Sequence, residues 1–376
     1  MKEIKLLQIV PSLESGGVEQ GTIDVANYIA ENGFISLVCS NGGRMLTMLN
    51  KKKAAHIKLP VNSKNPLVIY NNIKKIKKII KKHKVNLVHV RSRAPAWSAY
   101  FASKNLCNLT STFHNIYGNK NIFKKYYNKR LSKTNKIVAI SQYVKDSISN
   151  IYNIDKKKIT VIHRGIDIDF FDPKLNNEDL YIKFLSVYNI PSDKKIIIYP
   201  ARLTQWKGQI EFLNILNLLK KEGIICYFIG DDKNKKYKIK LEKEIYKRKL
   251  HTFCKILGHL SRQDMRLMYK IADLVISAPL QPEGFGRVIS EGLAMEKIVL
   301  CYNFGGSKEQ ISNLDDLYAV EPFNHKQFLE KIKISLALSD SKKNKIGKIA
   351  RKHIDLNFSK KNMLKKYLDF YKKIVL

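Results

Sequence analysis

Short runs of apolar residues, rich in Ile and Val, alternate along the chain with longer stretches in which apolar residues recur every three or four positions. The short runs have the length and composition of buried strands, and the longer stretches have the period of amphipathic helices. The predicted strands are "IKLLQIV", "ISLVCS", "VNLVHV", "STFH", "KIVAIS", "KIIIYPA", "ICYFIG", "CKILG", "LVISAP" and "KIVLCY". The alternation predicts an α/β protein with doubly wound parallel sheets.

The strand and helix alternation occurs twice and is broken once. The break lies near "ITVIHRGIDIDFFDPK", where a predicted strand ends and a turn-rich stretch begins. A chain of 376 residues is also too long for one ordinary core. We therefore expect two Rossmann-like domains, with a boundary close to residues 165 to 185.

The loops that follow the strands are the first places to search for a site, because ligands of such sheets bind beyond the carboxyl ends of the strands. In "PSLESGGVEQG", Gly16 and Gly17 precede a helix and could bring backbone N–H groups to an anion. A dinucleotide site is a poor alternative, because Gly16, Gly17 and Gly21 do not form GxGxxG and no acidic residue ends the second strand. A simple tight turn that binds no ligand remains an open alternative for this loop.

A second strand, loop and helix sequence carries two cations, Arg202 and Lys207, in "IIIYPARLTQWKGQIEF". An arginine can hold phosphate oxygens with two donors, and a lysine near a helix start adds a point charge where the helix dipole also favours anions. The alternative is a solvated loop with two surface cations.

A third loop, "QPEGFGRVISEGLAM", places Glu283 and Glu291 eight positions apart. Glycosidase acids flank the scissile bond on both sides, which two residues of one loop and helix do not do easily. The helix is expected to begin near Gly286, with Gly284 and Gly286 allowing close approach of an anion to the backbone. The two glutamates are therefore interpreted as hydroxyl binders.

Taken together, five ordered motifs resemble the family 4 glycosyltransferases, which have the two-Rossmann-domain GT-B architecture. They are "SGGVE", "HRGIDIDFFDP", "ARLTQWKG", "EGFGRVISE" and "NFGGSKEQI". The resemblance implies transfer of a sugar from a nucleotide-sugar with retention at the anomeric carbon. It further implies that Arg202 and Lys207 hold the diphosphate, that Glu283 binds the donor sugar and that Glu291 binds the ribose.

The resemblance also suggests the other site residues. His114, which ends a strand, would face the donor sugar and is counted with the catalytic set, although a lone loop histidine is more often structural. Gly305 and Gly306 would form a loop on the acceptor side or a simple turn, Glu309 is a weaker candidate, and the role of Arg164 is uncertain. The remaining donor-binding candidates are Gly16, Gly17, Gly284, Phe285, Gly286 and Arg287.

The family architecture gives the expected division of the chain. Residues 1–170 would form the acceptor-side domain, 171–355 the nucleotide-sugar domain, and 356–376 a closing helix that returns to the first domain, the two domains facing a central cleft. The apolar stripe of that helix is Met363, Tyr367, Phe370 and Ile374.

No metal and no other cofactor is expected. Asp167 and Asp169 form an Asp-x-Asp, and hard cations prefer such carboxylates. We do not favour a metal site there, because Arg202 and Lys207 already supply neutralising charge. By resemblance to bacterial lipopolysaccharide-core mannosyltransferases, GDP-mannose is the first donor candidate and a UDP-sugar the second.

The charge suggests a partner surface. Lys and Arg number 69 against 32 Asp and Glu, a net charge of +37 that favours anionic partners, although part of it reflects a lysine-rich composition. A helix from about 69 to 84 would bury Ile69, Ile73, Ile76 and Ile80 and expose lysines to an anionic leaflet. "NIFKKYYNKRLSK" adds aromatics among cations.

We therefore expect a cytoplasmic enzyme, peripheral at the inner face of the membrane, acting on a glycolipid or lipopolysaccharide acceptor. Five scattered cysteines without CxxC spacing and the lack of a signal peptide or long apolar run agree with this location. Two alternatives stay open: a transferase for a soluble sugar acceptor, and a basic nucleic-acid-binding protein, which would leave the Glu283 and Glu291 motif unexplained.

Overall fold

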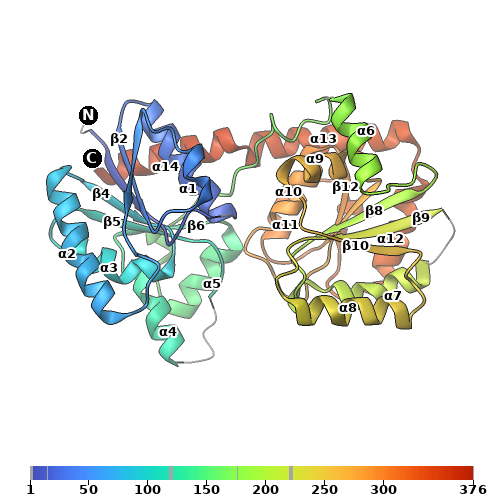
Figure 1. The fold of residues 1–376 in the computed structure, drawn as a ribbon, viewed down its shortest axis with the longest axis horizontal. Helices are drawn as coiled ribbons and strands as arrows, with labels where there is room; N and C mark the ends of the chain where they lie inside the picture. The colour runs from blue at the N-terminus through green and yellow to red at the C-terminus, as the bar shows by residue number, and fades with distance from the viewer. Residues whose placement is uncertain (1–2, 15, 118–121, 176, 220–222, 376) are drawn as a thin grey trace. The chain divides into compact units, whose positions relative to one another are not determined.

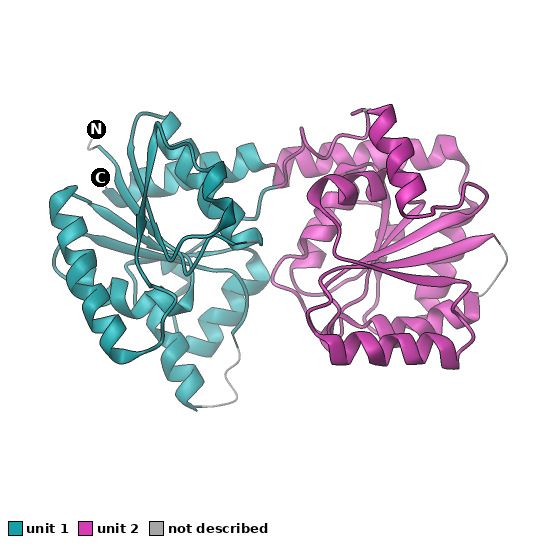
Figure 2. Ribbon diagram, viewed as in Figure 1, with its two compact units in different colours: residues 1–165, 360–376 teal, residues 166–359 magenta. Residues whose placement is uncertain are grey.

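The computed structural model describes residues 3–14, 16–117, 122–175, 177–219 and 223–375. The chain forms two compact units, shown in Figure 2: unit 1 comprises residues 1–165 and 360–376, and unit 2 comprises residues 166–359. Each unit is a parallel sheet covered by helices on both faces (Figure 1). The α/β, doubly wound fold class predicted from the sequence is confirmed.

The sheet of unit 1 has the strand order β3-β2-β1-β4-β5-β6-β7, with every neighbouring pair parallel. The order reverses direction between β1 and β4, so the crevice beyond their carboxyl ends is a topological switch point. The strands are β1 Lys5–Ile9, β2 Ile35–Ser40, β3 Ala54–Lys58, β4 Leu87–Val90, β5 Asn108–Phe113, β6 Lys136–Ala139 and β7 Ile159–Val161.

Helices cover both faces of this sheet: α1 packs against α14, and α2 packs against α3 (Figure 1). Their bounds are α1 Gly17–Glu31, α2 Pro66–Lys82, α3 Arg93–Ser103, α4 Ile122–Lys129, α5 Gln142–Tyr152 and α14 Lys360–Val375. Short 3₁₀ turns occupy Arg44–Met48, Arg130–Ser132 and Lys156–Lys158.

The sheet of unit 2 has the order β10-β9-β8-β11-β12-β13 and is parallel throughout, with its switch between β8 and β11. Its strands are β8 Lys195–Pro200, β9 Ile224–Ile229, β10 Cys254–Gly258, β11 Leu274–Ser277, β12 Ile298–Tyr302 and β13 Ala319–Val320. The helices are α6 Glu178–Val187, α7 Gln209–Leu219, α8 Lys235–Lys247, α9 Arg262–Ile271, α10 Arg287–Ala294, α11 Gly306–Ile311, α12 His325–Ala337 and α13 Asp340–Phe358. Two 3₁₀ turns, Gln205–Lys207 and Asp316–Tyr318, complete it.

The end of the chain differs in detail from the single closing helix expected over 356–376. Helix α13 ends at Phe358, Ser359 is extended with φ −70° and ψ 152°, and α14 begins at Lys360. Met363, Tyr367 and Phe370 of the predicted stripe of α14 are buried in the core of unit 1, with residues of β1, α1 and β4, and Ile374 is half-buried against the same core. The change of unit therefore falls at 165/166 and 359/360, where we expected 170/171 and 355/356.

A buried polar chain links α14 to the sheet of unit 1. The Nδ1 atom of His89 lies 2.5 Å from the hydroxyl of Tyr371, and its Nε2 lies 2.8 Å from the hydroxyl of Thr112. Burial, together with the charge of Arg91, holds the pKa of His89 well below its ordinary value. The histidine is therefore neutral and positions α14.

Helix α2 ends at Lys82 rather than near residue 84, because His83 caps it and Lys84 has a left-handed φ of 50°. Its predicted apolar stripe is buried or half-buried, and its lysines are exposed. None of the described helices is long and apolar enough to cross a bilayer. The five cysteines are free thiols, and all but the half-buried Cys107 are buried.

Candidate active site

Lys207 is placed by the connection between β8 and α7. Gly208 follows it with φ 79°, and a Cβ there would lie 2.4 Å from the carbonyl oxygen of Ala278, so only glycine fits. The hydroxyl of Tyr199 donates to the carbonyl of Lys207 and accepts from the backbone N–H of Ala278 at 3.2 Å. These contacts fix the lysine against the end of the neighbouring strand β11.

The ammonium of Lys207 forms an ion pair with the carboxylate of Glu283. The two side chains are only 12% and 14% exposed, and the ammonium also lies 4.4 Å from the centre of the Trp206 ring. Two residues that the sequence analysis assigned to different parts of the donor are thus in direct contact. In this arrangement each charge compensates the other.

Arg202 lies in the same connection, and its backbone is fixed while its side chain extends to solvent. Its carbonyl accepts from Nε2 of Gln209 at 2.9 Å, and Gln209 is itself held by the hydroxyl of Tyr237 at 3.1 Å. The exposed guanidinium bonds to no residue of the described ranges. The guanidinium of Arg202 is therefore available to bind an anion.

The loop between β11 and α10 brings Gly284 and Gly286 to the same edge of the sheet. Gly286 caps α10 with φ 84°, which favours glycine, and no side chain caps this helix start. An uncapped helix start presents first-turn N–H groups and the positive end of the dipole. The start of α10 is thus suited to a phosphate.

Gly305 and Gly306 pack directly behind this loop. The N–H of Gly306 donates to the carbonyl of Glu283 at 2.8 Å, and a Cβ at Gly306 would lie 2.4 Å from the carbonyl oxygen of Gly284. At Gly305, with φ 63°, a Cβ would lie 2.8 Å from the Glu283 carbonyl. The two glycines therefore shape the Glu283 loop, whatever they do for an acceptor.

Gln310, which was not predicted as a site residue, holds the same loop in place through hydrogen bonds. This fully buried side chain donates to the carbonyl of Phe285 and accepts from the hydroxyl of Ser290. The available signal was its position in "NFGGSKEQI", next to the half-buried Glu309. The ring of Phe285 packs against Phe358 in the core, so only its backbone belongs to the loop surface.

Glu291 is held by two partners, one on its own helix α10 and one on the neighbouring helix α9. Arg287 donates to its Oε1 at 2.7 Å, and the hydroxyl of Tyr269 donates to its Oε2 at 3.0 Å. Tyr269 was also missed from the sequence. Burial and then the charge of Glu291 hold the pKa of Tyr269 well above its ordinary value, so it remains a donor.

Unit 1 places its candidates at the carboxyl edge of its own sheet. Gly16 precedes α1 with φ 121°, and the guanidinium of Arg164 donates to the carbonyl of Gly17. Glu19 folds back toward this start, since its Oε2 lies 2.8 Å from where a Cβ of Gly16 would be. Gly16, Gly17 and Arg164 therefore belong to one cluster, although Ser15 of the same motif lies outside the described residues.

His114 directly follows β5, and its two ring nitrogens are buried without a hydrogen-bond partner in the described structure. Burial holds its pKa well below the ordinary value, and the charges of Arg164 and Arg91 act in the same direction. A neutral imidazole with free nitrogens can donate to or accept from a sugar hydroxyl. The structure contains no feature that assigns that role to it.

Of the two carboxylates in the Asp-x-Asp stretch, that of Asp167 forms an ion pair with Arg262 at 3.2 Å, and that of Asp169 belongs to an exposed residue. Within the described ranges there is no group of three or more His, Cys, Asp or Glu side chains placed to hold a metal.

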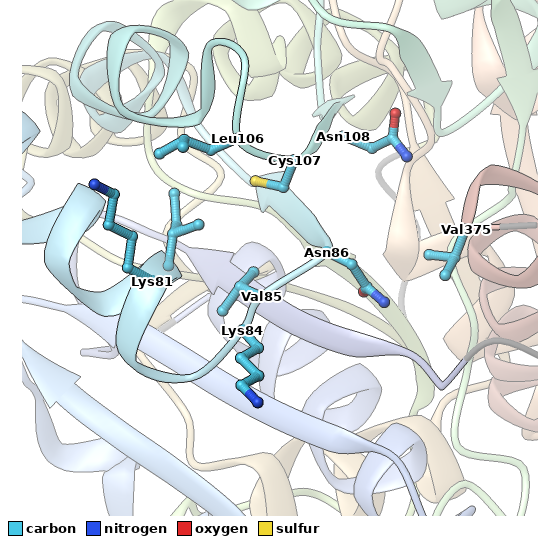
Figure 3. Close-up of a pocket in the computed structure, with 9 residues that line it drawn as sticks. Lys81, Lys84, Val85, Asn86, Leu106, Cys107, Asn108 and Val375 are labelled. Carbon is cyan, nitrogen blue, oxygen red and sulfur yellow. The ribbon is translucent and has the colours of Figure 1, made fainter.

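Two cavities lie away from these residues, one in each unit. A cavity of about 510 Å³ in unit 1 lies where β4 and β5 begin, and Figure 3 shows its lining, including Lys81, Lys84 and Cys107. Its two asparagines are bonded: Asn86 donates to the carbonyl of Glu3 and accepts from the N–H of Lys5, and Asn108 donates to the carbonyl of Ile374. A second cavity, of about 490 Å³, lies in unit 2. Because the first lies at the amino ends of the strands, with its asparagines already bonded, we do not take it as the site.

Two family models match the chain. "Glycosyltransferase Family 4" matches residues 15–170, and "Glycosyl transferases group 1" matches residues 183–353. Each match therefore falls almost entirely within one of the two units, and the second includes the loops that carry Lys207 and Glu283.

Solved and curated relatives span nearly the whole chain. A glycosyltransferase from Rickettsia africae is 40% identical, with 100% of this chain and 99% of that one covered and a TM-score of 0.89. The Anabaena protein HepE, solved in complex with UDP and glucose, is 18% identical with a TM-score of 0.83 over 99% of this chain and 100% of that one. The Escherichia coli UDP-Gal:alpha-D-GlcNAc-diphosphoundecaprenol alpha-1,3-galactosyltransferase is 22% identical over 85% of this chain and 84% of its own length.

The two matched family models, the full-length relative at 40% identity and the two doubly wound units agree with the resemblance found in the sequence motifs. The chain belongs to family 4 of the glycosyltransferases and has the GT-B fold.

Proposed function

We propose that the enzyme transfers a hexose, with retention of anomeric configuration, from a nucleotide-sugar to a glycan acceptor of the cell envelope. The observation that carries the donor part is the shielded ion pair of Lys207 and Glu283 beside the uncapped start of α10. This one edge of unit 2 combines a cation and a helix start for a diphosphate with a carboxylate for sugar hydroxyls.

Charge development explains why such a site accelerates transfer. When the bond between sugar and phosphate breaks, negative charge grows on the leaving diphosphate and positive charge grows on the sugar ring. Lys207 and Arg202 would stabilise that leaving group more strongly in the transition state than in the ground state. We propose that these cations make a metal unnecessary, and that the departing phosphate itself takes the acceptor proton.

The donor is proposed to be a nucleoside diphosphate hexose. Motif resemblance favours GDP-mannose, whereas the names of two relatives specify UDP-Gal for one and UDP with glucose for the other. Because the names of both relatives specify UDP, we propose a UDP-sugar as the first donor candidate and GDP-mannose as the second. Incubation of the enzyme with UDP-glucose, UDP-galactose or GDP-mannose, with release of UDP or GDP as the readout, decides between them. Release of neither nucleotide would contradict the proposed activity.

Retention has its own test. A donor with a known anomeric configuration is transferred to an acceptor, and the new linkage is read from its proton coupling in an NMR spectrum. The same configuration in donor and product is expected. An inverted linkage would contradict the proposal.

The acceptor is proposed to be lipid-linked, with lipopolysaccharide core as the first candidate. One relative is named for the acceptor GlcNAc-diphosphoundecaprenol. In this chain, α4 exposes Ile122, Phe123 and Tyr126 at 78%, 81% and 64% among lysines, and α2 exposes its lysines along one side. Residue 121, the first residue of the stretch "NIFKKYYNKRLSK", lies outside the described residues. Aromatic side chains among cations suit the interface of an anionic bilayer.

Liposome binding tests the membrane part. Changing Lys74, Lys75, Lys77 and Lys78 to Gln should release the enzyme from anionic liposomes while leaving transfer to a short soluble acceptor unchanged. Because Coulombic attraction is screened over about 8 Å at physiological salt, binding of the unaltered enzyme should weaken steeply as salt rises. Equal binding to neutral liposomes, or none to anionic ones at low salt, would contradict the proposal and favour a soluble acceptor.

A nucleic-acid-binding role is the alternative from another class, since the charge alone would permit it. It gives no reason for the Lys207 and Glu283 pair. Strong retention of RNA by nuclease-treated protein, with no nucleotide-sugar turnover, would favour it.

A further inference from the structure

Arg91 is a buried arginine that no sequence motif singled out. It directly follows β4, beside β1, and therefore lies at the switch point of the unit 1 sheet. Its side chain is 1% exposed. Nη2 donates to the carbonyl of Gly21 at 2.7 Å, Nε donates to the hydroxyl of Thr22 at 3.3 Å, and the guanidinium lies 4.9 Å from the centre of the Tyr367 ring.

All of these partners are neutral, and one nitrogen of the guanidinium has no partner. Within the described ranges no carboxylate pairs with Arg91, and its buried Nη1 has no hydrogen-bond partner. An arginine cannot lose its proton, so burial leaves a full positive charge that only an anion can neutralise. An unsatisfied buried donor is unfavourable, because it has lost its hydrogen bonds to water without gaining others.

A second guanidinium lies on the same part of α1. Nη2 of Arg91 and Nη2 of Arg164 each lie 3.9 Å from the position that a Cβ of Gly21 would occupy. His114, which follows the next strand β5, also has two unpaired buried nitrogens and is close enough for both arginine charges to lower its pKa. Unpartnered polar atoms from two neighbouring strands thus meet beside two cations.

The groups around Arg91 include one carboxyl group and a third guanidinium. Glu19, in the first turn of α1, interacts with Arg164, but burial raises the pKa of Glu19. Arg93 contacts the Tyr117 ring at 4.2 Å and the amide oxygen of Asn128 at 3.2 Å. Within the described ranges, the hydrogen bonds and ring contacts of Arg91 and of Arg93 are therefore all with neutral groups.

We propose that Arg91 and Arg164 form an oxyanion site that binds an acidic group of the acceptor, either a phosphate or a carboxylate. The inference rests on the proposed transferase function and names the acceptor class: an acidic glycan or a phosphate-bearing glycolipid. It differs from the donor site, because Lys207, Arg202 and the start of α10 in unit 2 serve the donor diphosphate.

Binding of small acidic sugars tests the site directly. Glucose 6-phosphate and glucuronate, each compared with glucose, are titrated by calorimetry at constant ionic strength, with UDP or GDP present in saturating amounts. The phosphate probe and the carboxylate probe distinguish the two kinds of acidic group. At least one acidic sugar should bind roughly 10-fold or more tightly than glucose, because charge-assisted contacts are about twice as strong as neutral ones.

The variants make the assignment specific. Arg91→Lys keeps the charge but loses the planar fork and should weaken the acidic probe by about 10-fold. Arg164→Lys should act in the same direction and serves if Arg91→Lys does not fold. Arg248→Met is the matched control, since Arg248 pairs with Glu244 at 3.1 Å in unit 2; this variant should bind the probe normally.

Three results would overturn the proposal. The first is equal binding of acidic and neutral sugars, which would mean that buried water satisfies the polar atoms. The second is competition of the acidic sugar with UDP or GDP, which would place the sugar in the donor site. The third is unaltered binding of the acidic sugar in both arginine variants. Failure of the transferase function is separate, because it would appear as a lack of nucleotide release with acidic-sugar binding intact.

Discussion

The carboxyl edges of the two sheets handle charge differently. In unit 2 the candidate residues are paired with one another, Lys207 with Glu283 and Arg287 with Glu291. In unit 1 the buried Arg91 contacts only neutral groups and retains an unused donor. In the part of the chain that the structure describes, two ion pairs at the edge of unit 2 neutralise four side chains and leave Arg202 unpaired, whereas at the edge of unit 1 a buried guanidinium contacts only neutral groups.

This difference separates two modes of binding. A ligand in unit 2 must exchange partners with an existing ion pair, so its affinity is the difference between two sets of contacts. A ligand in unit 1 would add partners to atoms that have none, which relieves an existing cost. Loss of one member of the unit 2 pair should therefore disable the site, whereas changes in unit 1 should weaken binding gradually.

The largest expected effect comes from breaking the unit 2 pair. Lys207→Ala removes the cation proposed to neutralise the leaving diphosphate and leaves the half-buried Glu283 uncompensated, so turnover should fall about 100-fold or more. Steady-state kinetics measures it, and circular dichroism checks the fold. Lys233→Ala is the control, since that lysine is 86% exposed in its pair with Asp231. A folded Lys207→Ala enzyme with normal turnover would remove Lys207 from the mechanism.

A smaller effect is expected where a neutral group supports a charged one. Tyr269→Phe removes the 3.0 Å hydrogen bond to Glu291 but leaves the bond from Arg287. One lost hydrogen bond of about 1 kcal/mol should raise the dissociation constant of the nucleoside diphosphate several-fold. Calorimetric titration measures this, with the exposed Tyr246→Phe as the control. Equal dissociation constants of the nucleoside diphosphate in the two variants would contradict a role of Glu291 in nucleotide binding.

Acid should destabilise unit 1 before unit 2. Burial lowers the pKa of His89 and of His114 well below the ordinary value of about 6.5, so the unfolded chain takes up protons that the folded unit refuses. Their contribution is complete above that value and is lost as the pH falls below it. In unit 2 the pKa of His353 is also lowered by burial, but its hydrogen bond to the Gln310 carbonyl opposes that shift.

Hydrogen exchange at pH 7.5 and 5.5 measures this difference. Peptides from β4 and β5 should lose more protection at the lower pH than peptides from β11 and β12. Equal loss in both units would contradict the account of the two buried histidines.

The smallest expected effect is that of metal removal. If Lys207 and Arg202 supply the neutralising charge, nucleotide-sugar turnover should be unchanged in excess EDTA. Loss of activity that magnesium or manganese restores would instead return attention to Asp167 and Asp169.

Much of the fold followed from local pattern. The apolar runs predicted eleven strands at positions where the structure has them, including the strand that ends at the break near "ITVIHRG", because buried parallel strands are continuous runs of Ile and Val. Strand β3, "AAHIK", was missed because its two alanines and His56 do not form the run of Ile and Val that marks most of the other strands, and β13 was missed because it has only two residues. The break between α13 and α14 at Ser359 was missed because serine gives only a weak helix-ending signal.

The candidate site was less accessible to sequence reasoning. Motif resemblance pointed to Lys207 and Glu283 separately, but their contact joins residues 76 positions apart through the adjacency of β8 and β11. Gln310 supports the loop and Tyr269 supports Glu291 from other helices, and a buried polar residue on a helix has no distinctive pattern in one sequence. Arg91 was passed over because only strand order and burial reveal that it lies at a switch point without a counter-charge.

The central claim, that the paired cluster of unit 2 is the donor site, is tested most directly by thermal unfolding with UDP, GDP and ADP. We expect one of them to stabilise the enzyme, by about 2.7 kcal/mol at 100 times its dissociation constant. The same nucleotide should give a much smaller shift with Lys207→Ala and an unchanged shift with Lys233→Ala. No stabilisation by any of the three, or an equal shift in Lys207→Ala, would contradict the account.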